Sequence, residues 1–208
     1  MELYEALEKR RTCRDYSDRE VSDEILKRVI GAAFKAPTND HLRQLEFGVV
    51  RGRENIAPII DPLAKNMAAF KKLVHEADES GDKDKMAMFA DALPKQQRML
   101  MQSGLLILPF FRQKQSPLLK PVEQSSLNYF ASAWCALENM LLAATAEGLG
   151  TVFHIPVGDE AEKIKEIVGA PEDYEFICLL TMGYPAADAF RPKQKEIDIG
   201  ERIHTNVW

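Results

Sequence analysis

The stretch ELYEALEKRRTCR, residues 2–14, joins an amphipathic segment to a cluster of three arginines. Leu3, Ala6 and Leu7 recur at the spacing of one helical face, which predicts a short helix. The cluster Arg10-Arg11-Thr12-Cys13-Arg14 then falls at the end of that helix and in the turn after it. A guanidinium group is planar, permanently charged and able to bind phosphate through two hydrogen bonds. The cluster therefore suits an anionic ligand, and its alternative role is to offset the negative end of the helix dipole.

The composition is typical of one soluble globular domain. The chain has 208 residues, of which 46% are hydrophobic and 28% are charged. Its net charge of −5 argues against nucleic acid as a partner. No apolar run approaches the ~20 residues that span a bilayer, so no membrane association is expected. The three cysteines have neither paired nor metal-type spacing, which predicts a reducing, cytoplasmic location.

Several common kinds of site are excluded by their missing motifs. The four histidines are widely separated, so a zinc site is not expected. Neither a GxxxxGK loop nor a GxGxxG fingerprint is present. A nucleotide-like ligand must therefore be held without a glycine-rich loop.

Helical and strand patterns alternate along the chain. Strands are predicted at residues 47–50, 105–111, 151–153 and 176–182, with Pro109 marking an end or an irregularity. Helices are predicted from Ser22 to the break at Pro37, at 55–74 with an interruption at Pro62, at 86–103 with a bend near Pro94, at 125–147, and after a cap at Asp159. This alternation predicts an α+β fold, an α/β sandwich, in a single domain over residues 1–208.

Four short motifs stand at the ends of these elements. They are Arg10-Arg11-Thr12-Cys13-Arg14, Ala36-Pro37-Thr38-Asn39-Asp40-His41-Leu42-Arg43-Gln44-Leu45-Glu46-Phe47, Gly148-Leu149-Gly150 and Gly183-Tyr184-Pro185. In this order the chain resembles the FMN-dependent nitroreductase family over essentially its whole length. His41, Arg43 and Leu45 stand where that family usually has Asn, Gln and Trp.

The resemblance implies a central, mainly antiparallel sheet flanked by helices, and an intertwined homodimer with FMN at the subunit interface. The helix predicted at 125–147 is apolar over most of its surface and rich in alanine, which suits a core or a subunit interface.

The resemblance also implies which residues bind FMN. Arg10 and Thr12 would contact the phosphate, with Arg11 acting mainly through its backbone, and Arg14 would approach the pyrimidine edge of the flavin. The other implied contacts are Pro37, Thr38, Asn39 and His41 of the partner subunit, Arg98 beside the ring, the backbone of Ile155, Pro156, Val157 and Gly158 at the reactive edge, and Lys193 and Lys195 at the phosphate. For Arg98, Lys193 and Lys195 a solvated surface position is the alternative. His154 is expected to satisfy a core or interface hydrogen bond rather than to act as an acid.

The implied activity is that of an FMN oxidoreductase. NADH or NADPH would reduce the flavin, and a small electron-poor acceptor such as a nitroaromatic or a quinone would then reoxidise it in a ping-pong reaction. Two alternatives stay open. One is a specialised flavin-dependent reductase, for example for reductive dehalogenation, and the other is a non-enzymatic flavin-binding protein.

Overall fold

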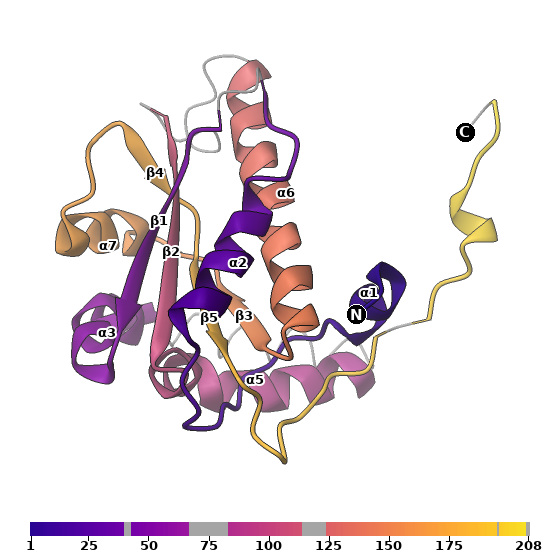
Figure 1. Ribbon diagram of the computed structural model, residues 1–208, viewed down its shortest axis with the longest axis horizontal. Helices are drawn as coiled ribbons and strands as arrows, with labels where there is room; N and C mark the ends of the chain where they lie inside the picture. The colour runs from indigo at the N-terminus through magenta and orange to yellow at the C-terminus, as the bar shows by residue number, and fades with distance from the viewer. Residues whose placement is uncertain (40–42, 67–82, 114–123, 195, 207–208) are drawn as a thin grey trace.

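The computed structural model describes residues 1–39, 43–66, 83–113, 124–194 and 196–206. Its centre is a sheet in the order β1 (Leu45–Arg51), β2 (Leu105–Arg112), β5 (Leu179–Gly183) and β3 (Gly150–His154) (Figure 1). A short strand, β4 (Tyr174–Phe176), also pairs with β2. Each of these strand pairs is antiparallel, which confirms the predicted sheet.

Strand β2 shows why both faces of the sheet are covered. Leu105 and Ile107 belong to one buried hydrophobic cluster, whereas Leu106 and Leu108 belong to a second. Successive side chains of a strand point to opposite faces, so an uninterrupted apolar run requires a cover on each side. The apolar run of β2 therefore sits at the centre of a layered α+β fold.

Helices provide the two covers. Helices α2 (Asp23–Ala33) and α6 (Gln124–Ala146) pack together against one face, and α1 (Leu3–Lys9) contacts α6 (Figure 1). Helices α3 (Arg53–Ile60), α5 (Lys83–Gln102) and α7 (Glu160–Val168) contribute to the cluster on the other. The predicted cap of α2 is confirmed, because Ser22 Oγ accepts a hydrogen bond from Ile25 N at 3.4 Å. The predicted helix at 125–147 is confirmed as α6.

Three helix predictions need correction. The predicted helix at 55–74 is α3 followed by a 3-10 helix at Asp61–Asn66, and residues 67–74 lie outside the described residues. Helix α5 begins at Lys83, earlier than predicted, and continues through Pro94. Asp159 precedes α7 as predicted, but its side chain does not cap the helix, because its carboxylate pairs with Lys163 instead.

Pro109 lies inside β2, where an end or an irregularity was expected. It pairs with Phe47 of β1, and its carbonyl accepts a hydrogen bond from Ile177 N at 3.1 Å. The N–H and C=O groups of one strand residue point to the same neighbour, so the missing N–H of proline faces residues 177–178. Strand pairing is interrupted at those residues, and the predicted strand at 176–182 is therefore split into β4 and β5.

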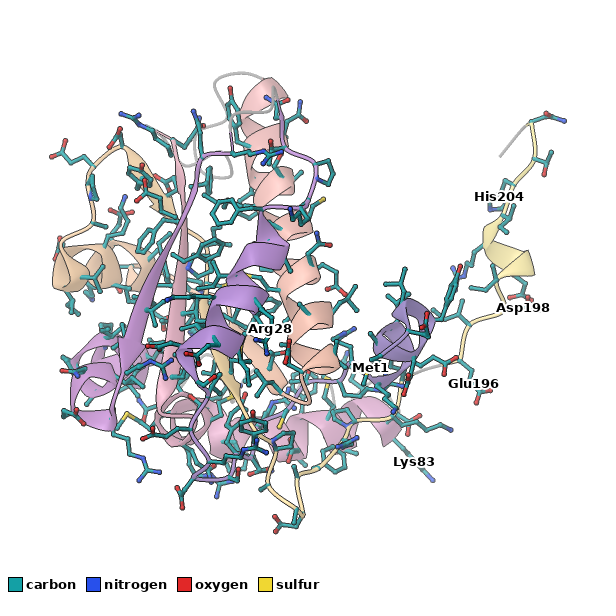
Figure 2. All side chains as sticks on the ribbon, in the orientation of Figure 1. Met1, Arg28, Lys83, Glu196, Asp198 and His204 are labelled. Carbon is teal, nitrogen blue, oxygen red and sulfur yellow. The ribbon has the colours of Figure 1, made fainter. Side chains whose placement is uncertain are left out.

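Two terminal segments expose apolar side chains. In α1, Leu3 and Tyr4 are 61% and 80% exposed. The C-terminal segment runs away from the sheet, as its yellow trace in Figure 1 and the positions of Glu196, Asp198 and His204 in Figure 2 show. Its isoleucines, Ile197, Ile199 and Ile203, are all exposed. Both segments present apolar surface that the described chain leaves in contact with solvent.

Candidate functional site

Residues 12–16, here called the anchored segment, are fixed against β3 and against the chain that follows β5. Cys13 N donates to Thr151 O at 2.9 Å, and Ala186 N donates to Asp15 O at 3.0 Å. The Tyr16 hydroxyl is buried within 2.7 Å of Thr181 Oγ1 on β5. The backbone on both sides of Arg14 is therefore held in place, by β3 on one side and by the chain that follows β5 on the other.

Two glycines allow this close approach. A Cβ atom at Gly150 would lie 2.5 Å from Cys13 Cβ, and one at Gly183 would lie 2.9 Å from Tyr16 Cδ1. Any larger residue at either position would push the anchored segment away from the sheet. This is the physical reason for the last glycine of Gly148-Leu149-Gly150 and the first residue of Gly183-Tyr184-Pro185.

Arg14 is buried with one hydrogen-bonding group unused. Its Nη1 contacts Asp91 Oδ2 of α5 at 3.2 Å, and both side chains are 10% exposed. Its Nε has no hydrogen-bond partner among the described residues. A buried donor without a partner costs about 1–3 kcal/mol, so an acceptor is expected to approach Arg14 from a bound molecule.

Further ion pairs extend from Asp91 along α5. Lys95 Nζ contacts one carboxylate oxygen of Asp91 and one of Asp15. Arg98 Nη2 contacts the other oxygen of Asp15 at 2.9 Å. Burial lowers the pKa of Lys95, but its bonds to Asp15 and Asp91 outweigh that effect, so the pKa is raised and the amine stays charged. Arg98, predicted to lie beside a flavin, is 58% exposed at the outer end of this network.

A cavity of about 230 Å³ lies beside the anchored segment and is lined by three basic residues, Lys9, Arg11 and Arg191. Thr12, Cys13 and Gly150 are also in its wall. Among the described residues, Arg10 and Lys193 are not in this wall, and Lys195 lies outside the described residues. Arg191 was missed because a tail without regular structure gives no spacing rule that would select it over Lys193.

The described part of the predicted turn, residues 36–39, lies apart from this cavity. Asn39 N donates to Ser132 Oγ of α6 at 2.9 Å, and Thr38 and Asn39 line a small cavity with Arg43 and Tyr129. Pro37 is exposed, and His41 lies outside the described residues. The turn therefore sits against the N-terminal half of α6.

Residues 155–158, here called the apolar loop, follow the end of β3. Ile155 and Val157 are 50% and 38% exposed, Pro156 is partly buried, and Gly158 has a positive φ of 59°. Val157 N donates to Glu160 Oε2 at 3.0 Å, so this N–H is already engaged and cannot be the free donor that was predicted.

Glu160 holds the apolar loop by its hydrogen bond from Val157 N, a role that was not predicted from the sequence. Its side chain is fully buried, and Oε2 also lies 2.9 Å from His154 Nε2. The expectation that His154 satisfies a core hydrogen bond is confirmed, because this ring is 4% exposed and paired with Glu160. The only signal in the sequence is that His154 and Glu160 flank the loop.

Two further classes of site find no support in the described part of the chain. No group of three or more His, Cys, Asp or Glu side chains there could hold a metal ion. No helix among those residues is both long and apolar enough to cross a membrane.

Comparison with known proteins decides the family. The model described as "Nitroreductase family" matches residues 7–184. The chain belongs to the nitroreductase family. A family relative from Methanothermobacter thermautotrophicus, described as a candidate NADH dehydrogenase/NAD(P)H nitroreductase, is 29% identical over 210 residues that cover 100% of this chain and 88% of the relative.

Other similar proteins carry a different activity in their names. Iodotyrosine deiodinase 1 of Mus musculus is 29% identical, over 95% of this chain and 67% of its own length. A crystal structure of oxidised iodotyrosine deiodinase bound to FMN and 3-iodo-L-tyrosine aligns over 100% of both chains with a TM-score of 0.75 and 19% identity. At that identity the structural likeness supports the fold.

The nitroreductase-family chain thus holds predicted site residues at both ends of β3 and, separately, in the turn against α6. The basic cavity lies at the start of β3, and the apolar loop follows its end, about 16 Å away for five residues at 3.3 Å each. On α6, Ser132 contacts the turn and Thr145 lines the basic cavity. At a rise of 1.5 Å per residue, these two residues are about 20 Å apart along the helix. A ligand that reaches from the cavity to the apolar loop must be elongated.

Proposed function

We propose that this protein is an FMN-dependent oxidoreductase that takes reducing equivalents from NADH or NADPH and passes them to a small electron-poor acceptor. The observation that carries the proposal is Arg14, whose buried guanidinium has an unused Nε and which directly follows Thr12 and Cys13, two residues in the wall of the cavity that three basic side chains line. This donor set fits FMN, which combines a phosphate dianion with a ring that carries carbonyl acceptors.

Each part of the cofactor has a matching group. Arg11, Thr12, Lys9 and Arg191 would hold the phosphate, with Arg10 next to them in sequence. Arg14 would donate through Nε to the pyrimidine edge. When bound, FMN would supply the redox chemistry by accepting hydride from NAD(P)H and delivering electrons to the acceptor.

Arg14 and the apolar loop would act at the reactive part of the flavin. A guanidinium about 4 Å from a developing negative charge contributes roughly 4 kcal/mol at an effective dielectric of 20. Arg14 would favour electron uptake in this way. The apolar loop would bring Ile155 and Val157 against the acceptor, and the Gly158 N–H, rather than that of Val157, would face the ring.

We propose in addition that the protein acts as a homodimer with FMN between the subunits. Thr38 and Asn39 lie about 20 Å along α6 from the basic cavity, which favours a role for this turn at the cofactor of a second subunit. The exposed apolar side chains of α1 and of the C-terminal segment give a second subunit surface to cover. His41, Lys193 and Lys195 keep their predicted roles in this proposal.

Reductive dehalogenation is the second candidate activity. It is supported by the 29% identity to iodotyrosine deiodinase 1 over 95% of the chain. The two activities would share the cofactor site and differ in the molecule that lies against the apolar loop. A non-enzymatic flavin-binding protein is the third alternative.

The test begins with the visible spectrum of the purified protein, with added FMN if the protein is colourless. We expect flavin absorption that bleaches on anaerobic addition of NADH or NADPH. The reduced protein is then mixed separately with a nitroaromatic, a quinone and 3-iodo-L-tyrosine. Fast reoxidation by the nitroaromatic or the quinone supports the proposed reductase. Reoxidation by 3-iodo-L-tyrosine alone, with release of iodide, supports dehalogenation.

Other outcomes contradict the proposal directly. A protein that binds FMN, is not bleached by NAD(P)H and, once reduced with dithionite, is not reoxidised by any of the three is a flavin-binding protein only. A protein that stays colourless with FMN has no cofactor site. Steady-state rates that require a ternary complex would exclude the ping-pong scheme.

A further inference from the structure

The ion pairs around Arg14 form a network with a defined order of charge. From the buried end outward it runs Arg14, Asp91, Lys95, Asp15 and Arg98, so that cations and carboxylates alternate. Each member touches the next, and the three cations exceed the two carboxylates by one charge. Anchoring one arginine requires one carboxylate, so the extra members call for an explanation.

We propose that Asp91 and Lys95 tune the electron affinity of the flavin by acting on Arg14 with opposite signs. This inference rests on the proposed function, because it needs FMN at Arg14. Asp91 and Lys95 are positioning residues here, since neither is placed in contact with the cofactor.

The burial of the network makes this action effective. Asp91 and Arg14 are each 10% exposed, and Lys95 and Asp15 are each 16% exposed. Charges so poorly hydrated are weakly screened, and their field extends beyond the pair. The Asp91 carboxylate therefore offsets part of the positive field that Arg14 directs at a ligand. Lys95 restores part of it by neutralising Asp91 and Asp15 together.

Opposite shifts in potential follow from this order of charge. Removing the charge of Asp91 leaves Arg14 uncompensated, which stabilises reduced FMN relative to oxidised FMN. Removing the charge of Lys95 leaves two carboxylates near Arg14 and has the reverse effect. If the network only fastened α5 to the anchored segment, both variants would weaken the binding of oxidised and reduced FMN equally and leave the potential unchanged.

The experiment is an anaerobic redox titration of the FMN-loaded protein, with dissociation constants for oxidised and reduced FMN. The variants are Asp91→Asn and Lys95→Met. We expect Asp91→Asn to increase the preference for reduced over oxidised FMN about tenfold, which equals about 30 mV for a two-electron couple. Lys95→Met is expected to shift the preference in the opposite direction.

A matched control removes the same charge elsewhere. Asp173→Asn breaks the pair with Arg112, in which Nε lies 2.7 Å from Oδ2 and which has no member in the network. Its potential should equal that of the wild type. Arg98→Gln is the substitute variant if either buried variant fails to fold, because the Arg98 side chain is 58% exposed. It should lower the preference for reduced FMN about twofold.

The outcomes separate this inference from the function on which it rests. If the wild type binds no FMN, the proposed function fails and this inference fails with it. If the wild type binds FMN but Asp91→Asn and Lys95→Met keep its potential or shift it in the same direction, or if Arg98→Gln raises the preference for reduced FMN, only this inference is overturned. Opposite shifts, with an unchanged control, support it.

Discussion

The anchored segment and the apolar loop lie at opposite ends of β3 and are held in different ways. The anchored segment is tied to strands by its backbone, and its charged side chains are paired within a network. The apolar loop exposes Ile155 and Val157, and it is held by one buried carboxylate, that of Glu160. The first region is organised before any ligand binds, whereas the second leaves apolar surface uncovered.

This difference suits the two regions to different tasks, one to hold a bound ligand and the other to receive a molecule that exchanges. A fixed, partly unsatisfied guanidinium suits an anionic ligand that stays bound, because no ordering of the protein is needed when it binds. Exposed apolar side chains on a short loop suit a molecule that comes and goes, or the surface of a second subunit. The three predictions below test whether the two regions carry these separate tasks.

The largest effect is expected from Arg14→Met. Removing one partner of a buried ion pair leaves the other charge buried and less compensated, so the unfolding free energy of the apoprotein should fall by about 3 kcal/mol. Chemical denaturation measures this loss. Arg112→Met, in a pair whose arginine is 59% exposed, should cost less than about 1 kcal/mol. Equal losses in the two variants would show that the network around Arg14 does not hold the anchored segment.

A smaller effect is expected from Glu160→Met. The thioether keeps the length of the side chain but removes the acceptor oxygen that serves Val157 N and His154, at a cost of about 1–2 kcal/mol. Hydrogen exchange should show faster exchange at the Val157 amide and no change at the Cys13 amide. Glu162→Met, on the exposed side of α7, should change neither. Unaltered exchange at Val157 would mean that another contact holds the apolar loop.

The smallest effect on stability is expected from Ile155→Ser. Because this side chain is 50% exposed, the unfolding free energy should change by less than about 0.5 kcal/mol. If the acceptor lies against the apolar loop, its KM should rise while kcat stays the same. Steady-state kinetics with a nitroaromatic and a quinone measure both constants. A fall in kcat without a change in KM would argue against a binding role for the loop.

The parts of the fold that depend on local sequence were predictable. The cap at Ser22, the long apolar helix α6 and the apolar run of β2 each follow from residues that lie next to one another. The position of Pro109 was not predictable, because the break that accommodates it lies between β4 and β5, more than 60 residues later in the sequence.

The candidate site likewise contains residues that a local motif identifies and residues that no local pattern identifies. Arg11, Thr12 and Arg14 follow from one short motif, and the structure places them at one end of β3. Asp91 pairs with an arginine 77 residues away, and no local pattern identifies it. Glu160 stands in the first turn of a helix, where acidic side chains are usually exposed, yet it is fully buried. Arg191 lies in a tail without periodic structure.

The length of α6 has a consequence for genetics. If two subunits share each cofactor as proposed, the turn at one end of α6 and the basic cavity at the other serve different cofactors. A chain damaged at the turn and a chain damaged at the cavity would each be inactive alone. A mixed dimer of the two would combine both defects in one site and leave the other site intact. Two defective alleles expressed in the same cell would therefore complement each other.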